Sequence, residues 1–439
     1  MLQRSLIGAA TALTLGLASA AQAQTEITWW HAMGGALGER VNKIAEDFNA
    51  SQSDYKVVPV YKGSYAETLT AGIAAFRADE QPHIMQVFEV GTATMMAAKG
   101  AVYPVYQLME DAGESFDPSA YLQAVIGYYT DPEGHMLSLP FNSSTPVLFH
   151  NKQAFEKAGL DPDSSPKTWA EMAEAATKIV ESDAAACGFT TSWISWIQLE
   201  NLSAWHNIFF ASENDGFDGL GADLLIDQDL PLRHVTNMND WQKNNAFKYG
   251  GRMSQSAPLF YSQECAMFFG SSAAYAGIKT NAKDFSFGVG MLPYYDDVKG
   301  APQNSIIGGA SLWVLKGHPQ AEYKGVAEFF TYLSSPKVQA WWHQETGYLP
   351  ITTAAYELTK QEGFYEKFPG TETAIKQITL NPPTAASKGL RLGNFVQIRD
   401  VINEELEEIF SGSKTPEQGL EDAVKRSNEL LRQFEDANS

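Results

Sequence analysis

Two adjacent glycines, Gly308 and Gly309, interrupt a stretch at residues 304–315 that is otherwise apolar and rich in strand-forming side chains. Glycines within a strand mark a bulge or a place where another chain segment approaches closely. Their backbone N–H groups, unshielded by side chains, can also donate hydrogen bonds to a bound anion. The stretch therefore predicts either a plain bulged strand or a strand that supplies donors to an anion site.

Catalytic chemistry finds no comparable support in the sequence. There is no Gly-x-Ser-x-Gly or His-Glu-x-x-His motif, and the eight histidines show no spacing typical of metal ligands. Tyr65, Glu89 and Ser144 form no nucleophile–base pair. We therefore expect a binding protein rather than an enzyme, with no metal and no cofactor.

Length and charge narrow the class of protein. The 439 residues suit two or three domains, and 44% hydrophobic with 19% charged residues is typical of a folded globular chain. The formal net charge of -21, with no clustered basic residues, argues against a nucleic-acid partner. An anionic ligand would have to be held by local donors against this overall charge.

The first 23 residues predict a secretory signal peptide. Arg4 provides the charged start, residues 6–17 the apolar segment, and Ala21-Gln22-Ala23 a cleavage site between small residues. The apolar segment is too short to span a membrane, so we expect an exported, soluble protein of the bacterial periplasm. In that oxidising compartment the two cysteines, Cys187 and Cys265, are expected to form a disulfide, the alternative being two buried thiols.

The elements that could position a site follow an alternating pattern near the start of the mature chain. Strand patterns at 26–31, 57–61 and 82–87 alternate with helical patterns that end near residues 48 and 76. This order predicts a parallel, doubly wound α/β sheet, in which ligands bind beyond the carboxyl ends of the strands. The loops at 62–65 and 88–90 are therefore of interest, and the polar bend at 142–145 suits a crossing between two lobes.

Together these features resemble the extracellular solute-binding proteins of ABC importers, the maltose-binding-like family. The resemblance covers the whole mature chain and narrows to the branch that binds sn-glycerol 3-phosphate. The segments that carry the narrower match are residues 196–201, 302–304, 306–314, 346–352 and 388–394.

The resemblance implies two α/β lobes, each a doubly wound sheet, with an interlobe cleft and three hinge crossings. After the signal peptide (1–23), we expect one lobe at 24–142 and 295–355, and the other at 143–294 and 356–439. It also implies delivery of the ligand to inner-membrane permease subunits with cytoplasmic ATPase subunits, by a monomer. A glycerophosphodiester could be a further ligand.

The resemblance also assigns the residues of the site. Arg399 is the expected cation, because a guanidinium fork matches phosphate oxygens; Glu89 would accept from the glycerol hydroxyls. The full predicted set is Tyr65, Glu89, Ser144, Trp193, Ser272, Gly309, Tyr348 and Arg399.

Three of these assignments keep a competitor from the neighbouring sequence. Arg391 competes with Arg399 as the cation, Ser271 with Ser272, and Trp196 with Trp193 as the wall of the glycerol site. The competing function is a neutral-sugar binder of the same fold. The arginine with its serine and glycine donors is the feature that a neutral sugar does not need.

Overall fold

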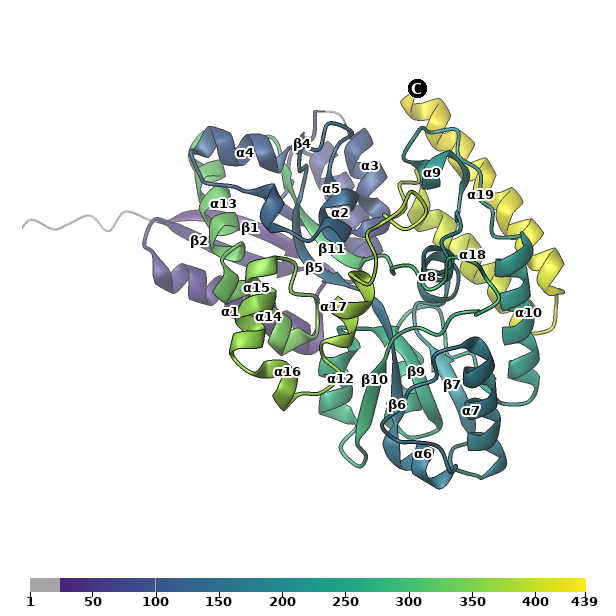
Figure 1. The fold of residues 1–439 in the computed structure, drawn as a ribbon. Helices are drawn as coiled ribbons and strands as arrows, with labels where there is room; N and C mark the ends of the chain where they lie inside the picture. Colours follow the sequence, from purple (N-terminus) through teal and green to yellow (C-terminus); the bar gives the residue numbers. More distant parts are fainter. Residues whose placement is uncertain (1–23, 99) are drawn as a thin grey trace, which may run out of the picture.

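The computed structural model describes residues 24–98 and 100–439, so the predicted signal peptide lies outside it. Two β-sheets, each with helices packed around it, lie side by side (Figure 1). Neither sheet is built from one continuous segment of the chain. Later segments return to the first sheet before the C-terminal helices cover the second. In the part described, no helix is both long and apolar enough to cross a membrane.

The first sheet contains the predicted parallel unit. Its elements are β1 (Thr25–His31), α1 (Gly35–Ser51), β2 (Tyr55–Tyr61), α2 (Tyr65–Arg77) and β3 (Ile84–Phe88). Strand β1 pairs in parallel with β2 and β3, which confirms the predicted β-α-β-α-β order. Ser64 and Glu67 form a capping box that starts α2 at Tyr65. Tyr65 and Glu89 therefore follow the carboxyl ends of β2 and β3, the two strands that flank β1.

Strand β11 (Gly308–Leu315) is the glycine-containing stretch, and it enters this sheet antiparallel to β3, β4 (Val102–Tyr103) and β5 (Leu139–Ser144). Its register against β5 shifts between Ala310 and Ser311, so the bulge is confirmed. Close approach is confirmed as well. Gly309 has φ +96°, and a Cβ there would overlap the backbone oxygen of Asn142. A Cβ on Gly308 would overlap the indole of Trp196.

The second sheet has the strand order β10-β6-β9-β7-β8. These strands are β6 (Pro146–Asn151), β7 (Cys187–Thr191), β8 (Phe247–Lys248), β9 (Cys265–Ser271) and β10 (Phe287–Gly290). Cys187 and Cys265 are direct partners on neighbouring parallel strands, with Cα atoms 4.5 Å apart, and they form the predicted disulfide. The bridge joins the amino ends of β7 and β9, whereas Ser271 ends β9 at the opposite edge.

The remaining helices surround the two sheets. They are the 3-10 turns Glu89–Gly91 and Pro118–Ala120, the π turn Trp196–Glu200, and α3 (Thr92–Ala97), α4 (Val105–Ala112), α5 (Gln123–Tyr129), α6 (Lys152–Lys157), α7 (Trp169–Glu181), α8 (Asn201–Trp205), α9 (Ser212–Gly216), α10 (Asp229–Lys243), α11 (Ala257–Tyr261), α12 (Ala274–Asn281), α13 (Gln320–Leu333), α14 (Pro336–Thr346), α15 (Thr353–Gln361), α16 (Phe364–Lys367), α17 (Thr373–Ile378), α18 (Phe395–Phe410) and α19 (Pro416–Asn438).

The chain passes between the sheets at closely bonded points. It leaves the first sheet at Ser144 and enters the second at Pro146, and the intervening Thr145 donates through its hydroxyl to Ser305 Oγ at 2.6 Å. Gln377 of α17 donates to the same Ser305 Oγ (3.0 Å) and to the backbone oxygen of Pro146 (2.7 Å). Figure 1 shows α17 in the middle of the molecule, between the two sheets. Buried hydrogen bonds thus tie segments near residues 145, 305 and 377 together.

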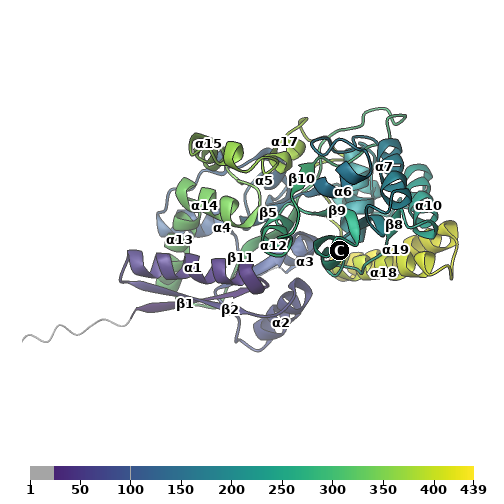
Figure 2. The same ribbon diagram turned by 90° about the horizontal axis from the view of Figure 1, so that it is seen from below.

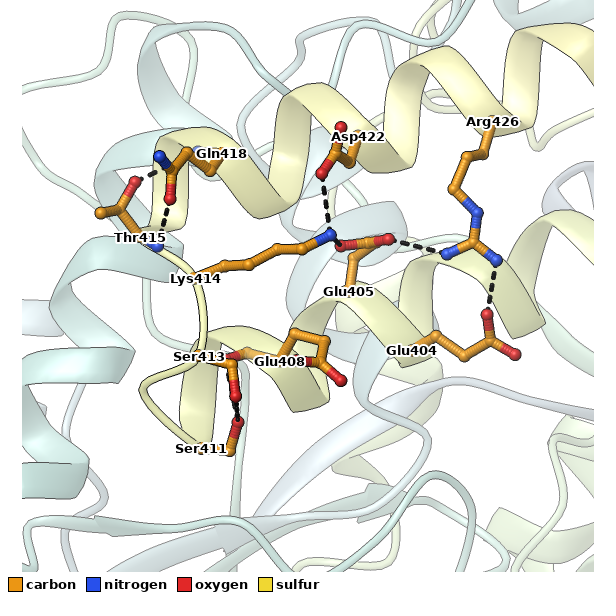
Figure 3. Close-up of polar contacts among 10 residues, drawn as sticks. All are labelled: Glu404, Glu405, Glu408, Ser411, Ser413, Lys414, Thr415, Gln418, Asp422 and Arg426. Carbon is orange, nitrogen blue, oxygen red and sulfur yellow. Dashed lines mark hydrogen bonds and ion pairs between the residues drawn. The ribbon is translucent and has the colours of Figure 1, made fainter.

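Helices α18 and α19 form a hairpin against the second sheet's side of the molecule (Figure 2). A capping box of Thr415 and Gln418 begins α19. Glu405 of α18, whose side chain is only 5% exposed, pairs with both Lys414 and Arg426, as Figure 3 shows. A buried carboxylate is tolerated when cations satisfy it. The Arg426 pair therefore fastens α19 to α18, the helix that carries Arg399, and Lys414 in the connection between the helices bridges Glu405 to Asp422 of α19.

Candidate functional site

The guanidinium of Arg399 forms the centre of the site. It is 7% exposed and lies near the start of α18. Its Nε and Nη2 atoms donate to the two carboxylate oxygens of Glu200, each at 2.7 Å. Nη2 also donates to Glu89 Oε1 at 2.6 Å. One arginine thus joins two buried carboxylates from distant parts of the chain.

Burial and charge act in opposite directions on this group. Burial raises the pKa of the Glu89 carboxyl, and the positive charge of Arg399 only partly offsets that effect. Burial also disfavours the charged form of Arg399, but the carboxylates of Glu200 and Glu89 outweigh it and raise the guanidinium pKa. Arg399 therefore stays cationic, whereas the Glu89 carboxyl is protonated more easily than an exposed glutamate because its pKa is raised.

Tyr65 joins the site through a chain of amides. Gln86 of β3 donates to Asn142 Oδ1 at 2.7 Å, and Asn142 of β5 donates through Nδ2 to the Tyr65 hydroxyl oxygen at 2.8 Å. The Tyr65 ring stacks on Phe88 with centroids 5.2 Å apart. Burial, with a further contribution from the neighbouring Tyr348 phenol, raises the pKa of Tyr65 well above its ordinary value. The phenol therefore remains a neutral hydrogen-bond donor.

Tyr348 is brought in by the glycine that ends α14. Gly347 has φ +81°, and a Cβ there would lie 2.6 Å from the backbone oxygen of Ser272, so only glycine fits. The Tyr348 ring then stacks on Trp342, 5.9 Å between centroids and 4° between planes. The backbone N–H of Leu349 donates to Ser143 O at 2.8 Å. Tyr348 is consequently fixed beside both the 142–145 bend and Ser272.

The two predicted serines lie where the sheets meet. In the pairing of β5 with β11, Ser144 is the register partner of Gly308 and Ser143 is the register partner of Gly309. The backbone N–H of Ser272 donates to Thr145 O at 2.9 Å. Within the described residues the Ser272 hydroxyl is buried and has no hydrogen-bond partner, whereas the Ser271 hydroxyl accepts from the Ala273 N–H at 3.2 Å. A buried hydroxyl without a partner is costly unless a ligand satisfies it.

The tryptophans separate into two environments. Trp196 is 4% exposed, and its indole Nε1 donates to Ile307 O at 3.4 Å while the ring covers Gly308. Trp193 is half-buried, with φ +46°, and its backbone N–H donates to Met253 O. Trp196 is therefore part of the packing under the glycine strand. Trp193 keeps a partly free ring next to it, although no ring stacking with the other predicted residues is found in the described chain.

Arg391, the competing cation, serves a different purpose. Its Nη2 donates to Thr130 O at 2.7 Å and lies 3.5 Å from the oxygens of Gly127 and Tyr128. These are carbonyls at the C-terminal end of α5, where a cation is favourable. The guanidinium also covers the Phe217 ring at 4.4 Å. Arg391 is thus engaged as a helix cap and interlocks α5 with the segment before α18.

The sequence did not predict two polar residues of the candidate site, Glu200 and Asn142. Glu200 occurred within a matching segment, but a single glutamate in a helical pattern usually indicates a solvated face. Asn142 belonged to the predicted crossing, yet its amide bonds Tyr65. The sequence signal for each residue was a polar side chain among apolar neighbours. In the structure Glu200 and Asn142 are fully buried, at 1% and 0% exposure.

A second polar group, His83, His318 and Glu322, gathers at the other side of β3. His83 Nδ1 accepts from the Thr28 N–H at 3.0 Å, so the proton is on Nε2, which contacts Glu322 Oε2 at 2.7 Å. A protonated nitrogen is not a metal ligand. The contacts of this group therefore serve to join β1, β3 and α13.

The arrangement is suited to binding a ligand rather than to catalysing a reaction. The Arg399 guanidinium joins Glu89 of the first sheet to Glu200 of the second sheet's side. The Tyr65 phenol is bonded to Asn142 of β5, and Ser144 ends β5 where the chain crosses to the second sheet. Such an arrangement, on two α/β lobes, defines a solute-binding protein that holds a small polar ligand between its lobes.

Comparisons with known proteins agree with this class. Residues 34–340 match the family model of the bacterial extracellular solute-binding proteins, and the chain belongs to that family. It is 54% identical over 428 residues to the sn-glycerol-3-phosphate-binding periplasmic protein UgpB of Yersinia pseudotuberculosis, covering 97% of each chain. It is 53% identical to UgpB of Pectobacterium atrosepticum, covering 97% of this chain and 96% of that one. These relatives are binding proteins, not enzymes, as the sequence predicted.

Solved structures confirm the two-lobed fold. The chain resembles UgpB from Mycobacterium tuberculosis in complex with glycerophosphocholine, with a TM-score of 0.78 at 19% identity over 93% of this chain and 99% of that one. It also resembles the cyclic alpha-maltosyl-1,6-maltose binding protein from Arthrobacter globiformis, with a TM-score of 0.73 at 19% identity, over 93% and 100% of the two chains.

A buried histidine behind Tyr348 makes this side of the site sensitive to acid. His343 Nδ1 donates to Tyr348 O, and Nε2 accepts from the Tyr365 hydroxyl at 3.0 Å. Burial lowers the His343 pKa to about 4, so the unfolded chain binds a proton more readily. The stability contributed by neutral His343 is complete above pH ~6.5 and is lost as pH falls toward ~4, by about 3 kcal/mol at most.

The His343→Gln variant should therefore lose less stability than the parent between pH 7 and pH 4.5 in denaturant unfolding. His135→Gln, on a side chain that is half exposed, is the matched control and should follow the parent. If all three proteins lose the same free energy of unfolding over this range, His343 does not carry the effect.

Proposed function

We propose that this protein captures sn-glycerol 3-phosphate between its lobes and delivers it to the permease of an ABC importer. The observation that carries the proposal is the buried Arg399 guanidinium, whose partner Glu89 lies near the neutral phenols of Tyr65 and Tyr348. A phosphate is recognised by a guanidinium fork together with N–H and O–H donors, and a glycerol moiety by an acceptor and an apolar wall. The names of the relatives that share about half of its residues support the same ligand.

Each predicted residue has a place in this proposal. Arg399 binds the phosphate, with donors from Ser144, Ser272, Tyr348 and the backbone of Gly309. Glu89 accepts from the glycerol hydroxyls, Tyr65 closes over the ligand, and Trp193 provides the wall. The free hydroxyl of Ser272 and the engaged hydroxyl of Ser271 favour Ser272 as the contact. The partly free ring of Trp193 likewise favours it over the covered Trp196.

The wider setting of the protein follows from the same proposal. The signal peptide directs the chain to the periplasm, where it acts as a soluble monomer and meets inner-membrane permease subunits whose ATPase partners are cytoplasmic. One lobe comprises 24–142 and 295–355, the other 143–294 and 356–439. The passage from β5 to β6 at Thr145 and the return between β10 and β11 support the first two boundaries. The boundary at 355 falls inside α15, which packs on α14.

Calorimetric titration tests the ligand. We expect saturable binding of sn-glycerol 3-phosphate at one site per chain, and much weaker binding of glycerol or inorganic phosphate, because each offers only part of the contacts. Glycerophosphocholine belongs in the same series, since it keeps the phosphodiester and the glycerol. Saturable binding of maltose without a response to glycerol 3-phosphate would instead establish the neutral-sugar function.

Removal of the guanidinium tests its role. Loss of a buried, hydrogen-bonded charge partner typically costs about 2–5 kcal/mol, so Arg399→Ala should weaken glycerol 3-phosphate binding roughly 30- to 5000-fold. Single losses of a serine or tyrosine hydroxyl should cost less, about 1–3 kcal/mol. The variant should also melt lower than the parent, because Glu89 and Glu200 lose their common partner.

The matched control is Arg252→Ala. Arg252 forms a similar pair with Glu407 on the same helix, but both side chains are 35% exposed. It should bind as the parent does. An Arg399→Ala protein that is folded and binds within about threefold of the parent, a difference below ~1 kcal/mol, would remove Arg399 as the phosphate anchor.

A further inference from the structure

The donors of Arg399 are not equally available. A guanidinium has five N–H donors arranged along two usable edges, a side-on edge of Nε and Nη2 and an end-on edge of Nη1 and Nη2. Glu200 occupies the complete side-on edge with two bonds of 2.7 Å. Glu89 takes the second proton of Nη2. These three bonds leave Nη1 as the part of the fork that they do not use.

The two carboxylates reach Arg399 from different sides. Glu200 ends the turn Trp196–Glu200, which follows β7 of the second sheet. Helix α18 packs on α10 and α19 at that side of the molecule, and it also contacts the turn Glu89–Gly91. Glu89 begins the turn Glu89–Gly91, directly after β3 of the first sheet. A movement of one sheet relative to the other would therefore change the contact of Arg399 with Glu89 and leave its contact with Glu200 intact.

The charges of the group impose a further condition. When both carboxylates are ionised, they and the one guanidinium leave a net negative charge in a buried place. A phosphate added without any rearrangement would be repelled, because like charges interact strongly away from water. Other groups that face Glu89 are the phenols of Tyr65, Tyr128, Tyr129 and Tyr348, and none of them adds positive charge.

We propose that Glu200 is a positioning residue, which holds the side-on edge of Arg399 throughout binding so that the end-on edge faces the ligand. Glu89 is the exchangeable partner: the phosphate replaces its carboxylate on Nη2 and adds Nη1, completing a bidentate end-on pair. This inference rests on the proposed function. It adds a role for Glu200, which the predicted site did not contain.

The exchange also accounts for selectivity. A carboxylate released from Arg399 remains buried and is costly unless another donor meets it. The hydroxyls of a glycerol moiety supply such donors in the same ligand that carries the phosphate. Inorganic phosphate displaces Glu89 without offering it a carbon-borne hydroxyl at the right distance. The site therefore favours molecules in which an anion and an adjacent diol occur together.

A double-mutant cycle on Glu200 and Arg399 tests the positioning role. The variants are Glu200→Gln, Arg399→Lys and the double variant, each titrated with sn-glycerol 3-phosphate and melted. Glu200→Gln should weaken binding about 10- to 100-fold, since one charge-assisted fork is lost. Because Glu200 acts through Arg399, the double variant should bind within about threefold of Arg399→Lys alone. A purely structural role would instead multiply the two losses.

The control is Glu407→Gln. Glu407 lies on α18, as Arg399 does, and it accepts an equivalent side-on pair of hydrogen bonds from Nε and Nη2 of Arg252, which the substitution breaks. It should bind within about twofold of the parent. Glu200→Gln binding as tightly as this control, or losses that multiply in the double variant, would overturn the proposal.

A second measurement does not require the Glu200 variant to fold. The Nε–H resonance of Arg399, assigned by its loss in Arg399→Lys, should be protected from exchange in the parent. It should stay so, with little change in shift, when sn-glycerol 3-phosphate saturates the protein. A resonance that moves strongly or exchanges rapidly on saturation would show that Glu200 no longer accepts the hydrogen bond from Nε of Arg399. A parent that does not bind this ligand contradicts the proposed function itself, whereas Nε–H protection in the free protein still reports on Glu200.

Discussion

The buried ion pairs of Arg399 with Glu89 and Glu200 are the interaction on which the proposed site depends. The chain carries a net charge of -21, so long-range attraction cannot bring in or retain an anion. The cation must act at short range, and burial makes each of its contacts stronger than in water. Burial also means that Arg399 cannot stand alone. Its two carboxylate partners satisfy the charge, and in the proposed exchange one of them gives way to the ligand.

The fold brings these groups together by close backbone approaches. Gly309 lies against the Asn142 backbone, and Gly347 lies against Ser272. Neither position has room for a side chain, so the strand β11 and the end of α14 can enter the region where Ser144 and Tyr348 lie. Hydrogen bonds among Thr145, Ser305 and Gln377 join the crossing segments. Farther away, the disulfide and the ion pairs of Glu405 fasten the second sheet and the helix that carries Arg399.

Local patterns were sufficient to predict the elements but not the electrostatics. The alternation of strands and helices at residues 26–87 predicted the parallel unit, and the glycine pair predicted both a bulge and a close approach. Resemblance to a family supplied the site residues, since Arg399 and Glu89 are 310 positions apart and no local pattern relates them. Neither reasoning revealed that Arg399 is already paired, because burial and pairing arise only from packing. For the same reason Arg391 could not be distinguished as a helix cap, nor Glu200 as a partner.

A crystal structure of the protein with sn-glycerol 3-phosphate would show whether a phosphate takes the end-on edge of Arg399 while Glu200 keeps the side-on edge. We expect phosphate oxygens within hydrogen-bond distance of Nη1 and Nη2, Glu200 still bonded to Nε, and Glu89 turned to the glycerol hydroxyls. A ligand whose phosphate lies away from Arg399, with the bond between Glu89 and Arg399 unchanged, would contradict it.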